Sequence, residues 1–141
     1  MNMRVVVPYD GSEQARKALD HAVERYGDGE IVLLYVQDFV AAGYEASPGA
    51  ALPGYWKEWY EDAQAEAEQL FEEAQARVDI DLETESAVGR PERAIVEYVE
   101  DNAVDAVVIG SHGRSGVSRV LLGSVAETVV RRSPVPVTVV R

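Results

Sequence analysis

Residues 4–12 read RVVVPYDGS and predict a strand followed directly by a helix. Three consecutive valines are typical of a short central strand that is covered on both faces. The segment from Pro8 to Gly11 ends that strand, and Ser12 is suited to cap the N-terminus of a helix. Apolar residues then recur at helical spacing up to Gly27, and residues 31–36 form a second apolar run of strand length. A strand, a helix and a strand in this order predict a right-handed βαβ unit.

The rest of the chain continues this alternation. Residues 56–78 show helical periodicity, with apolar side chains that include Tyr60 on one stripe, and helical patterns return over residues 91–99 and 124–132. Strand patterns cover residues 82–88, 106–109 and 135–140, the first typical of an edge strand with one wetter face. Residues 39–55 show no period and predict a loop, which could be a lid or a partner-binding segment. We expect one α/β domain over residues 1–141, a doubly wound five-stranded parallel sheet with helices on both faces, in the order βαβαβαβαβ.

The composition limits the classes of function. The 25 acidic and 13 basic residues give a formal net charge of −12, which argues against nucleic-acid binding because phosphate contacts need clustered Lys and Arg. The absence of cysteine excludes thiolate metal sites and cysteine nucleophiles. No apolar run approaches the ~18–20 residues of a membrane-spanning helix. The first residues lack the pattern of a secretory signal, so we expect a cytoplasmic protein without a membrane partner.

The acidity of the chain has two interpretations, and both stay open. It could serve ordinary solubility, or it could be an adaptation to a salt-rich cytosol, where screening mutes the repulsion between like charges. Lys17 and Lys57 are the only lysines, and this scarcity favours the halophilic interpretation.

Two segments are expected at the carboxyl edge of the sheet, where ligands bind in folds of this kind. One is Pro8 to Ser12, after the first strand, and the other is the glycine-bearing segment 110–116, after the fourth. Glycine allows backbone amides to approach an anion without interference from a Cβ, and successive amides or a helix N-terminus attract phosphate. Each segment alone could be a set of turns. The second is not a Walker loop, because it lacks the Lys-Ser/Thr pair.

The combined pattern is more specific. Gly110-x2-Gly113-x9-Gly123-Ser124 resembles the G-2x-G-9x-G-S/T signature of nucleotide-binding universal stress proteins. The Asp-Gly-Ser turn after the first strand, the late SPVPV stretch and the order of elements are also similar to that family. The resemblance covers essentially the whole chain.

The resemblance implies a site for ATP or another adenine nucleotide, together with Mg²⁺. It implies that Asp10 accepts hydrogen bonds from the ribose, that Pro8 and the backbone of Val36 flank the adenine, and that Ile109 and Gly110 approach the sugar and the α-phosphate. The implied phosphate contacts are Gly113, Gly123, Ser124 and the amide of Val125. Arg114 and His112 could meet phosphate or magnesium-bound water, or could be solvated loop residues. Asp10 could instead cap the first helix, and Trp56 or Tyr55 could fold over the nucleotide.

The resemblance also implies a class of function, which is an ATP-binding regulatory protein of the stress response whose nucleotide state is read by an unknown protein partner. The alternative is a slow ATP hydrolase or phosphotransferase. The sequence offers no obvious set of base, metal carboxylates and arginine for rapid phosphoryl transfer. A phosphorelay receiver would need an acidic cluster after the first strand, where Asp10 stands alone.

The last strand pattern predicts a homodimer. Residues 135–140 have strongly apolar β character, and the family precedent places this strand at the edge of the sheet. An edge strand presents unpaired amides and carbonyls that invite a second chain. Because Pro136 has no amide hydrogen to donate, we expect the pairing to centre on Val137 and Val139. The strand could instead be only the last strand of the core.

Overall fold

The computed structural model describes residues 2–38, 55–111 and 122–141. Residues 39–54 of the loop expected over residues 39–55, and the expected site residues His112, Gly113 and Arg114, lie outside these ranges. Along the chain the elements are β1 (Arg4–Pro8), α1 (Glu13–Tyr26), β2 (Glu30–Gln37), α2 (Tyr55–Arg77), β3 (Glu83–Val88), α3 (Pro91–Asp101), β4 (Ala106–Gly110), α4 (Ser124–Arg132) and β5 (Val137–Val140).

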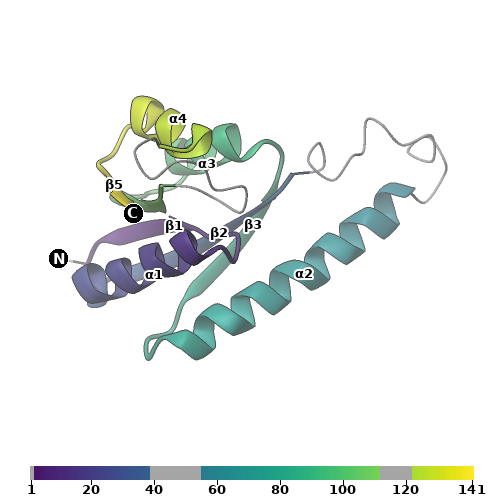
Figure 1. The fold of residues 1–141 in the computed structure, drawn as a ribbon, viewed down its shortest axis with the longest axis horizontal. Helices are drawn as coiled ribbons and strands as arrows, with labels where there is room; N and C mark the ends of the chain where they lie inside the picture. The colour runs from purple at the N-terminus through teal and green to yellow at the C-terminus, as the bar shows by residue number, and fades with distance from the viewer. Residues whose placement is uncertain (1, 39–54, 112–121) are drawn as a thin grey trace.

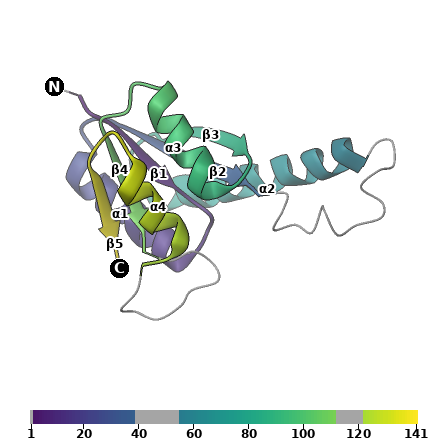
Figure 2. The same ribbon diagram turned by 90° about the horizontal axis from the view of Figure 1, so that it is seen from above.

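The strands form one five-stranded parallel sheet in the order β3-β2-β1-β4-β5. Helices α1 and α2 cover one face, and α3 and α4 cover the other (Figures 1 and 2). The chain winds outward from β1 to β3 and then returns to place β4 on the opposite side of β1. This confirms the doubly wound α/β fold, and it puts the reversal of strand order between β1 and β4. In such sheets ligands bind beyond the carboxyl ends of the strands at that reversal.

The core consists of two layers, one on each face of the sheet. Val5 and Val7 of β1 lie in the core on the α1/α2 side, whereas Val6 lies in the core on the α3/α4 side, and all three side chains are fully buried. Burying a valine side chain contributes roughly 1.5–3 kcal/mol to stability. The continuous apolar run of β1 therefore reflects burial on both faces, as the sequence predicts.

The edge strand β3 differs from its expected amphipathic pattern. Its position at the edge is confirmed, but Thr84, Ser86 and Val88 are exposed, as are Glu83 and Glu85 on the other face. The reason is the course of α2, whose buried residues pack with side chains of β1 and β2 in the α1/α2-side core rather than over β3. The prediction that one face of this strand is wetter than the other is therefore wrong, because both faces are exposed to water.

The first turns of α2 also differ from the expected apolar stripe. The helix begins at Tyr55, one residue inside the segment predicted as a loop, and Tyr60 is 49% exposed. Figure 1 shows the N-terminal part of α2 extending beyond the sheet. The helix becomes buried farther along its length, at Ala67, Leu70 and Ala74. Within the described parts of the chain, no helix combines the length and the apolar character needed to cross a membrane.

Candidate functional site

The turn after β1 brings a carboxylate to the end of that strand. Gly11 has a φ of +80°, a left-handed conformation that glycine adopts without strain. This turn allows Asp10 Oδ1 to accept a hydrogen bond from the Ser12 amide at 2.9 Å. Ser12 Oγ in turn accepts from the Ala15 amide at 3.2 Å and caps α1. The helix cap is therefore Ser12, and the half-buried Asp10 carboxylate stands in the turn before it.

The end of β4 lies against the first turn of α1. A Cβ placed on Gly110 would lie 2.8 Å from the carbonyl carbon, the carbonyl oxygen and the Cβ of Gln14. Only a residue without a side chain permits this approach. The first glycine of the sequence signature therefore has a packing role, which brings the β4 end next to the helix that follows Asp10.

A backbone hydrogen bond joins the end of β4 to the start of α4. The Gly123 amide donates to the carbonyl of Ser111 at 2.7 Å, and Ser111 is itself buried and donates its amide to Val140 at 2.9 Å. Gly123 is the N-cap of α4 and supplies no side-chain cap. The next amides, those of Ser124, Val125 and Ala126, have no acceptor within the helix. The N-terminus of α4 is thereby fixed beside the reversal of strand order, where its dipole favours an anion.

Strand β2 lies on the side of β1 opposite to β4. The last paired residue of β1, Pro8, lies level with Leu34, so β2 continues for three more residues past the end of β1. Val36 is half-buried and packs toward the α3/α4-side core. Gln37 is only 2% exposed, and neither polar atom of its side chain has a hydrogen-bond partner in the described structure. We call the carboxyl ends of β1, β2 and β4, together with the start of α4, the switch-point edge.

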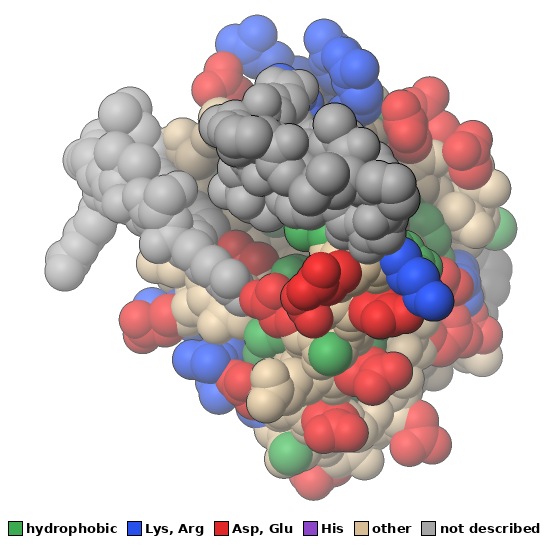
Figure 3. Space-filling model, turned by 90° about the vertical axis from the view of Figure 1, so that its right-hand side faces the viewer, with side chains coloured by type: hydrophobic (Ala, Val, Ile, Leu, Met, Phe, Trp, Pro, Cys, Tyr) green, Lys and Arg blue, Asp and Glu red, His purple; other side chains and the backbone are tan. Residues whose placement is uncertain are grey.

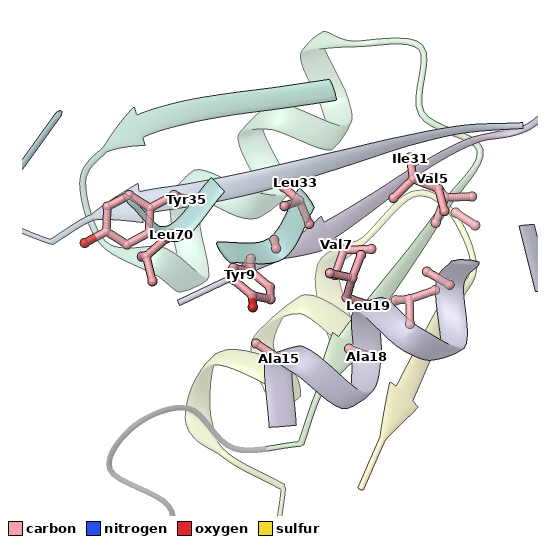
Figure 4. Close-up of a cluster of buried hydrophobic side chains, with 14 of the residues drawn as sticks. Val5, Val7, Tyr9, Ala15, Ala18, Leu19, Ile31, Leu33, Tyr35 and Leu70 are labelled. Carbon is pink, nitrogen blue, oxygen red and sulfur yellow. The ribbon is translucent and has the colours of Figure 1, made fainter. Parts of the chain in front are cut away.

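Aromatic side chains border the switch-point edge on the α1/α2 side. Figure 4 shows Tyr9 near Ala15 of α1, and Tyr35 of β2 near Leu70 of α2. Burial raises the pKa of the Tyr9 hydroxyl, and the neighbouring Arg16 acts in the opposite direction. Arg16 Nε also donates to Glu73 Oε1 of α2 at 3.0 Å. These contacts join the first turn of α1 to the C-terminal part of α2.

The face of the molecule toward which β2 runs carries many acidic side chains in its described part. Figure 3 views the molecule from the side toward which β2 runs, and acidic side chains gather in the lower half of that face. The acidic face of α2 follows from its sequence, which carries Glu or Asp at many exposed positions. An anion at this edge must therefore be held by local backbone amides or a cation, because the overall field repels it.

The sequence-predicted residues take distinct places in this arrangement. Pro8 and Asp10 lie at the end of β1, Gly110 at the end of β4, and Gly123 with the exposed Ser124 and the half-buried Val125 at the start of α4. The Ile109 side chain is buried in the α3/α4-side core, so only its backbone could meet a ligand. The sequence interpretation did not single out Ser111 or Gln37. The available signal for Gln37 was a polar side chain that ends an otherwise apolar strand.

The chain matches a known protein family over its full length. The model of the universal stress protein family covers residues 1–141. The chain belongs to this family. Universal stress protein MJ0531 of Methanocaldococcus jannaschii is 32% identical over 145 residues, which cover 98% of this chain and 81% of the relative. Universal stress protein MJ0577 of the same organism is 31% identical over 156 residues, which cover 100% and 96% of the two chains.

Solved structures of the family have the same fold. The universal stress protein UspA from Lactobacillus plantarum superimposes with a TM-score of 0.76 at 27% identity, covering 99% of this chain and 97% of the other. The structure of MJ0577 also gives a TM-score of 0.76, at 31% identity and with 99% and 96% coverage. A universal stress protein in complex with cAMP gives 0.65 at 29% identity, with 99% and 97% coverage.

Proposed function

We propose that this protein binds an adenine nucleotide, in particular ATP, at the switch-point edge and serves as a regulatory protein of the stress response. The observation that carries the proposal is the hydrogen bond from the Gly123 amide to the Ser111 carbonyl, 2.7 Å long, which fixes the α4 N-terminus beside the end of β4, the strand next to β1. The uncapped amides of α4 are suited to phosphate, and the Asp10 carboxylate in the adjacent turn is suited to ribose hydroxyls.

The relatives support the same ligand class. A family member of known structure, 29% identical to this chain, was solved in complex with cAMP, which contains adenine, ribose and phosphate. In our proposal the phosphates lie at α4, the ribose at Asp10, and the base toward β2 near Pro8 and Val36. The Gly123 amide already has an acceptor, so the amides of Ser124 and Val125 are the phosphate donors. Mg²⁺ would enter with the nucleotide and be held mainly by phosphate oxygens and water.

Binding, not turnover, is the proposed activity. The residues described by the structure contain no cluster of three or more His, Asp or Glu side chains that could hold a metal ion. A protein that only binds ATP would release phosphate far more slowly than the ~1–10³ s⁻¹ of dedicated enzymes. Steady-state phosphate release at such rates, abolished in Asp10→Ala, would instead establish the alternative of a hydrolase or phosphotransferase.

We further infer that two copies associate through the outer edge of β5. Among the described strands, β5 pairs only with β4 and forms one of the two edges of the sheet. The carbonyl of Pro136 accepts from Val107 of β4, and the carbonyl of Val140 accepts from Ser111, which directly follows β4. Because alternate residues of a strand face opposite neighbours, the backbone groups of Val137 and Val139 face away from β4. These groups are available to a second β5 in an antiparallel, two-fold arrangement.

The direct test of the proposed function is identification of the ligand. Protein purified without added nucleotide is denatured, and the released small molecules are identified by mass spectrometry. Calorimetry with ATP, ADP, AMP and cAMP on stripped protein then ranks their affinities. The proposal expects an adenine nucleotide among the released molecules or a dissociation constant in the micromolar range or below. Absence of both would refute it.

A further inference from the structure

The last residue of β2 carries a polar group that the fold does not use. The backbone carbonyl of Gln37 has a partner, since it accepts from the Gly89 amide at 3.0 Å. Its side-chain Nε2 and Oε1 are both buried, and neither has a hydrogen-bond partner in the described structure. Buried polar side chains in native proteins nearly always have partners. An unpaired amide in such a place indicates a missing partner, which is a ligand or a water molecule.

The position of Gln37 indicates which ligand this is. Gln37 directly follows Val36 and belongs to the part of β2 that continues past Pro8, the last paired residue of β1. This part of β2 lies across β1 from Gly110 and the α4 N-terminus. A nucleotide with its phosphates at α4 and its ribose at Asp10 would direct its base toward β2. The unpaired amide therefore lies at the β2 end of the site. Because side chains alternate along a strand, it lies on the α1/α2 face of the sheet, the face that also carries Tyr35.

The chemistry of the group matches adenine. A primary amide offers one donor and one acceptor side by side, and adenine presents an amino donor beside a ring-nitrogen acceptor. We propose that the Gln37 side-chain amide recognises the base of the bound nucleotide, with Oε1 accepting from the adenine amino group and Nε2 donating to the adjacent ring nitrogen. This inference rests on the proposed function and adds to it a residue that selects the base.

A water molecule is the competing occupant of the same place. A buried water needs at least two polar partners, and both atoms of the amide could serve. The two alternatives differ in their consequences. If the amide recognises the base, removing it weakens binding only of ligands that carry the amino group. If the amide holds water, removing it leaves the affinities for different bases in the same ratio.

The experiment compares two proteins with two ligands. The ligands are AMP and purine riboside 5′-monophosphate, which lacks the amino group, and the proteins are the wild type and Gln37→Leu. Calorimetry should show that the wild type binds AMP about tenfold or more tightly than the analogue, because the amide loses a partner with the latter. Gln37→Leu should bind AMP about tenfold less tightly than the wild type does, and should bind both ligands equally.

Stability without ligand separates this role from a structural one. Gln37→Leu should keep or raise the melting temperature, because it replaces an unpaired buried amide with an apolar group of similar size. Gln75→Leu is the matched control, since Gln75 Nε2 donates to the Ile80 carbonyl at 2.6 Å and its Oε1 accepts from Leu82 at 3.0 Å. That variant should lower the melting temperature and leave AMP binding unchanged. Gln37→Met replaces Gln37→Leu if the branched side chain prevents folding.

The outcomes distinguish the two proposals. A wild type that binds no adenine nucleotide would refute the proposed function and the role of Gln37 together. A wild type that binds AMP while Gln37→Leu keeps the same affinity and the same preference would refute only the role of Gln37. Equal binding of AMP and the analogue by the wild type would also refute that role alone. A loss of stability in Gln37→Leu as large as that in Gln75→Leu would show that the amide has a structural partner.

Discussion

Gly110 at the end of β4 and Gln14 in the first turn of α1 are in backbone contact, so close that a Cβ on residue 110 would lie 2.8 Å from three atoms of Gln14. Helix α1 begins directly after the Asp10 turn, and β4 leads into Ser111, whose carbonyl holds the start of α4. The contact therefore fixes the distance between the carboxylate side and the α4 side of the candidate site. Gly110, which the packing of the fold requires, therefore also determines the geometry of the site.

Gly110→Ala should destabilise the protein. The new methyl group would overlap backbone atoms of Gln14, which cannot move without shifting the start of α1, and overpacking of this kind costs roughly 1–3 kcal/mol. Chemical denaturation should show this as a lower midpoint with an unchanged slope.

The matched control for Gly110→Ala is Glu97→Ala, an exposed substitution within α3. It should change stability by no more than about 0.5 kcal/mol. If Gly110→Ala is as stable as this control, α1 and β4 are not in the contact described, and the glycine of the signature has no packing role.

The elements and their order could be predicted from the sequence because each one carries its own signal. Consecutive valines in β1 and β4 indicate burial on both faces, Ser12 indicates the start of α1, and Pro91 indicates the start of α3. The alternation of strands and helices then leaves a doubly wound sheet as the expected architecture. These signals are local, and each is contained within a few neighbouring residues.

Features that depend on distant parts of the chain could not be predicted. The Gly110 contact with Gln14, the exposure of β3 and the exposure of Tyr60 all depend on where a helix lies relative to the sheet. The unpaired amide of Gln37 is of the same kind, because the sequence shows a glutamine at the end of an apolar run but not its burial. Local patterns contain no information about such contacts.

Gly123→Val should abolish nucleotide binding while leaving the fold intact. Gly123 has φ −67° and ψ 158°, a conformation that any residue adopts, so valine introduces no backbone strain. Its amide can still donate to Ser111. The branched side chain would stand at the N-terminus of α4, where the phosphates are proposed to lie. Calorimetry with ATP should show at least a hundredfold loss of affinity, and circular dichroism should be unchanged.

Gly123→Ala provides a graded comparison, because a single methyl group should weaken binding less than the valine side chain does. Gly113→Val, at the second glycine of the signature, is expected to abolish binding as well. Affinity for ATP equal to that of the wild type in a folded Gly123→Val protein would place the phosphates somewhere other than at α4.

The melting temperature should rise by several degrees between low and molar KCl if the acidity is an adaptation to salt. At a net charge of −12, repulsion favours the unfolded chain, and the screening length falls from about 10 Å at 0.1 M to about 3 Å at 1 M. Salt also weakens exposed ion pairs between α1 and α2, such as Arg77 with Asp20 at 2.7 Å. These pairs contribute little, with typical values of about 0–1 kcal/mol, so the relief of repulsion should dominate.

A charge variant tests the cause of the salt effect. Glu68 and Glu72 are exposed on α2, and exchanging both for lysine raises the net charge by four units. This variant should be more stable than the wild type at low salt and should respond less to KCl. A melting temperature of the wild type that stays flat or falls as KCl increases would exclude the adaptation.

Val139→Pro should convert the proposed dimer into a monomer. The backbone of residue 139 faces away from β4, so proline removes an outward donor while the hydrogen bonds between β4 and β5 remain. Lysine at Val137 or Val139 would be a less selective test, because both side chains pack on the α3/α4-side core and a charge there would also disturb folding.

Val139→Ala is the matched control for Val139→Pro, since it trims the same side chain but keeps the amide. Sedimentation at tens of micromolar protein and matched salt should show a dimer for the wild type and Val139→Ala, and a monomer for Val139→Pro. A monomeric wild type, or a dimer that persists in a folded Val139→Pro, would show that β5 does not form the interface.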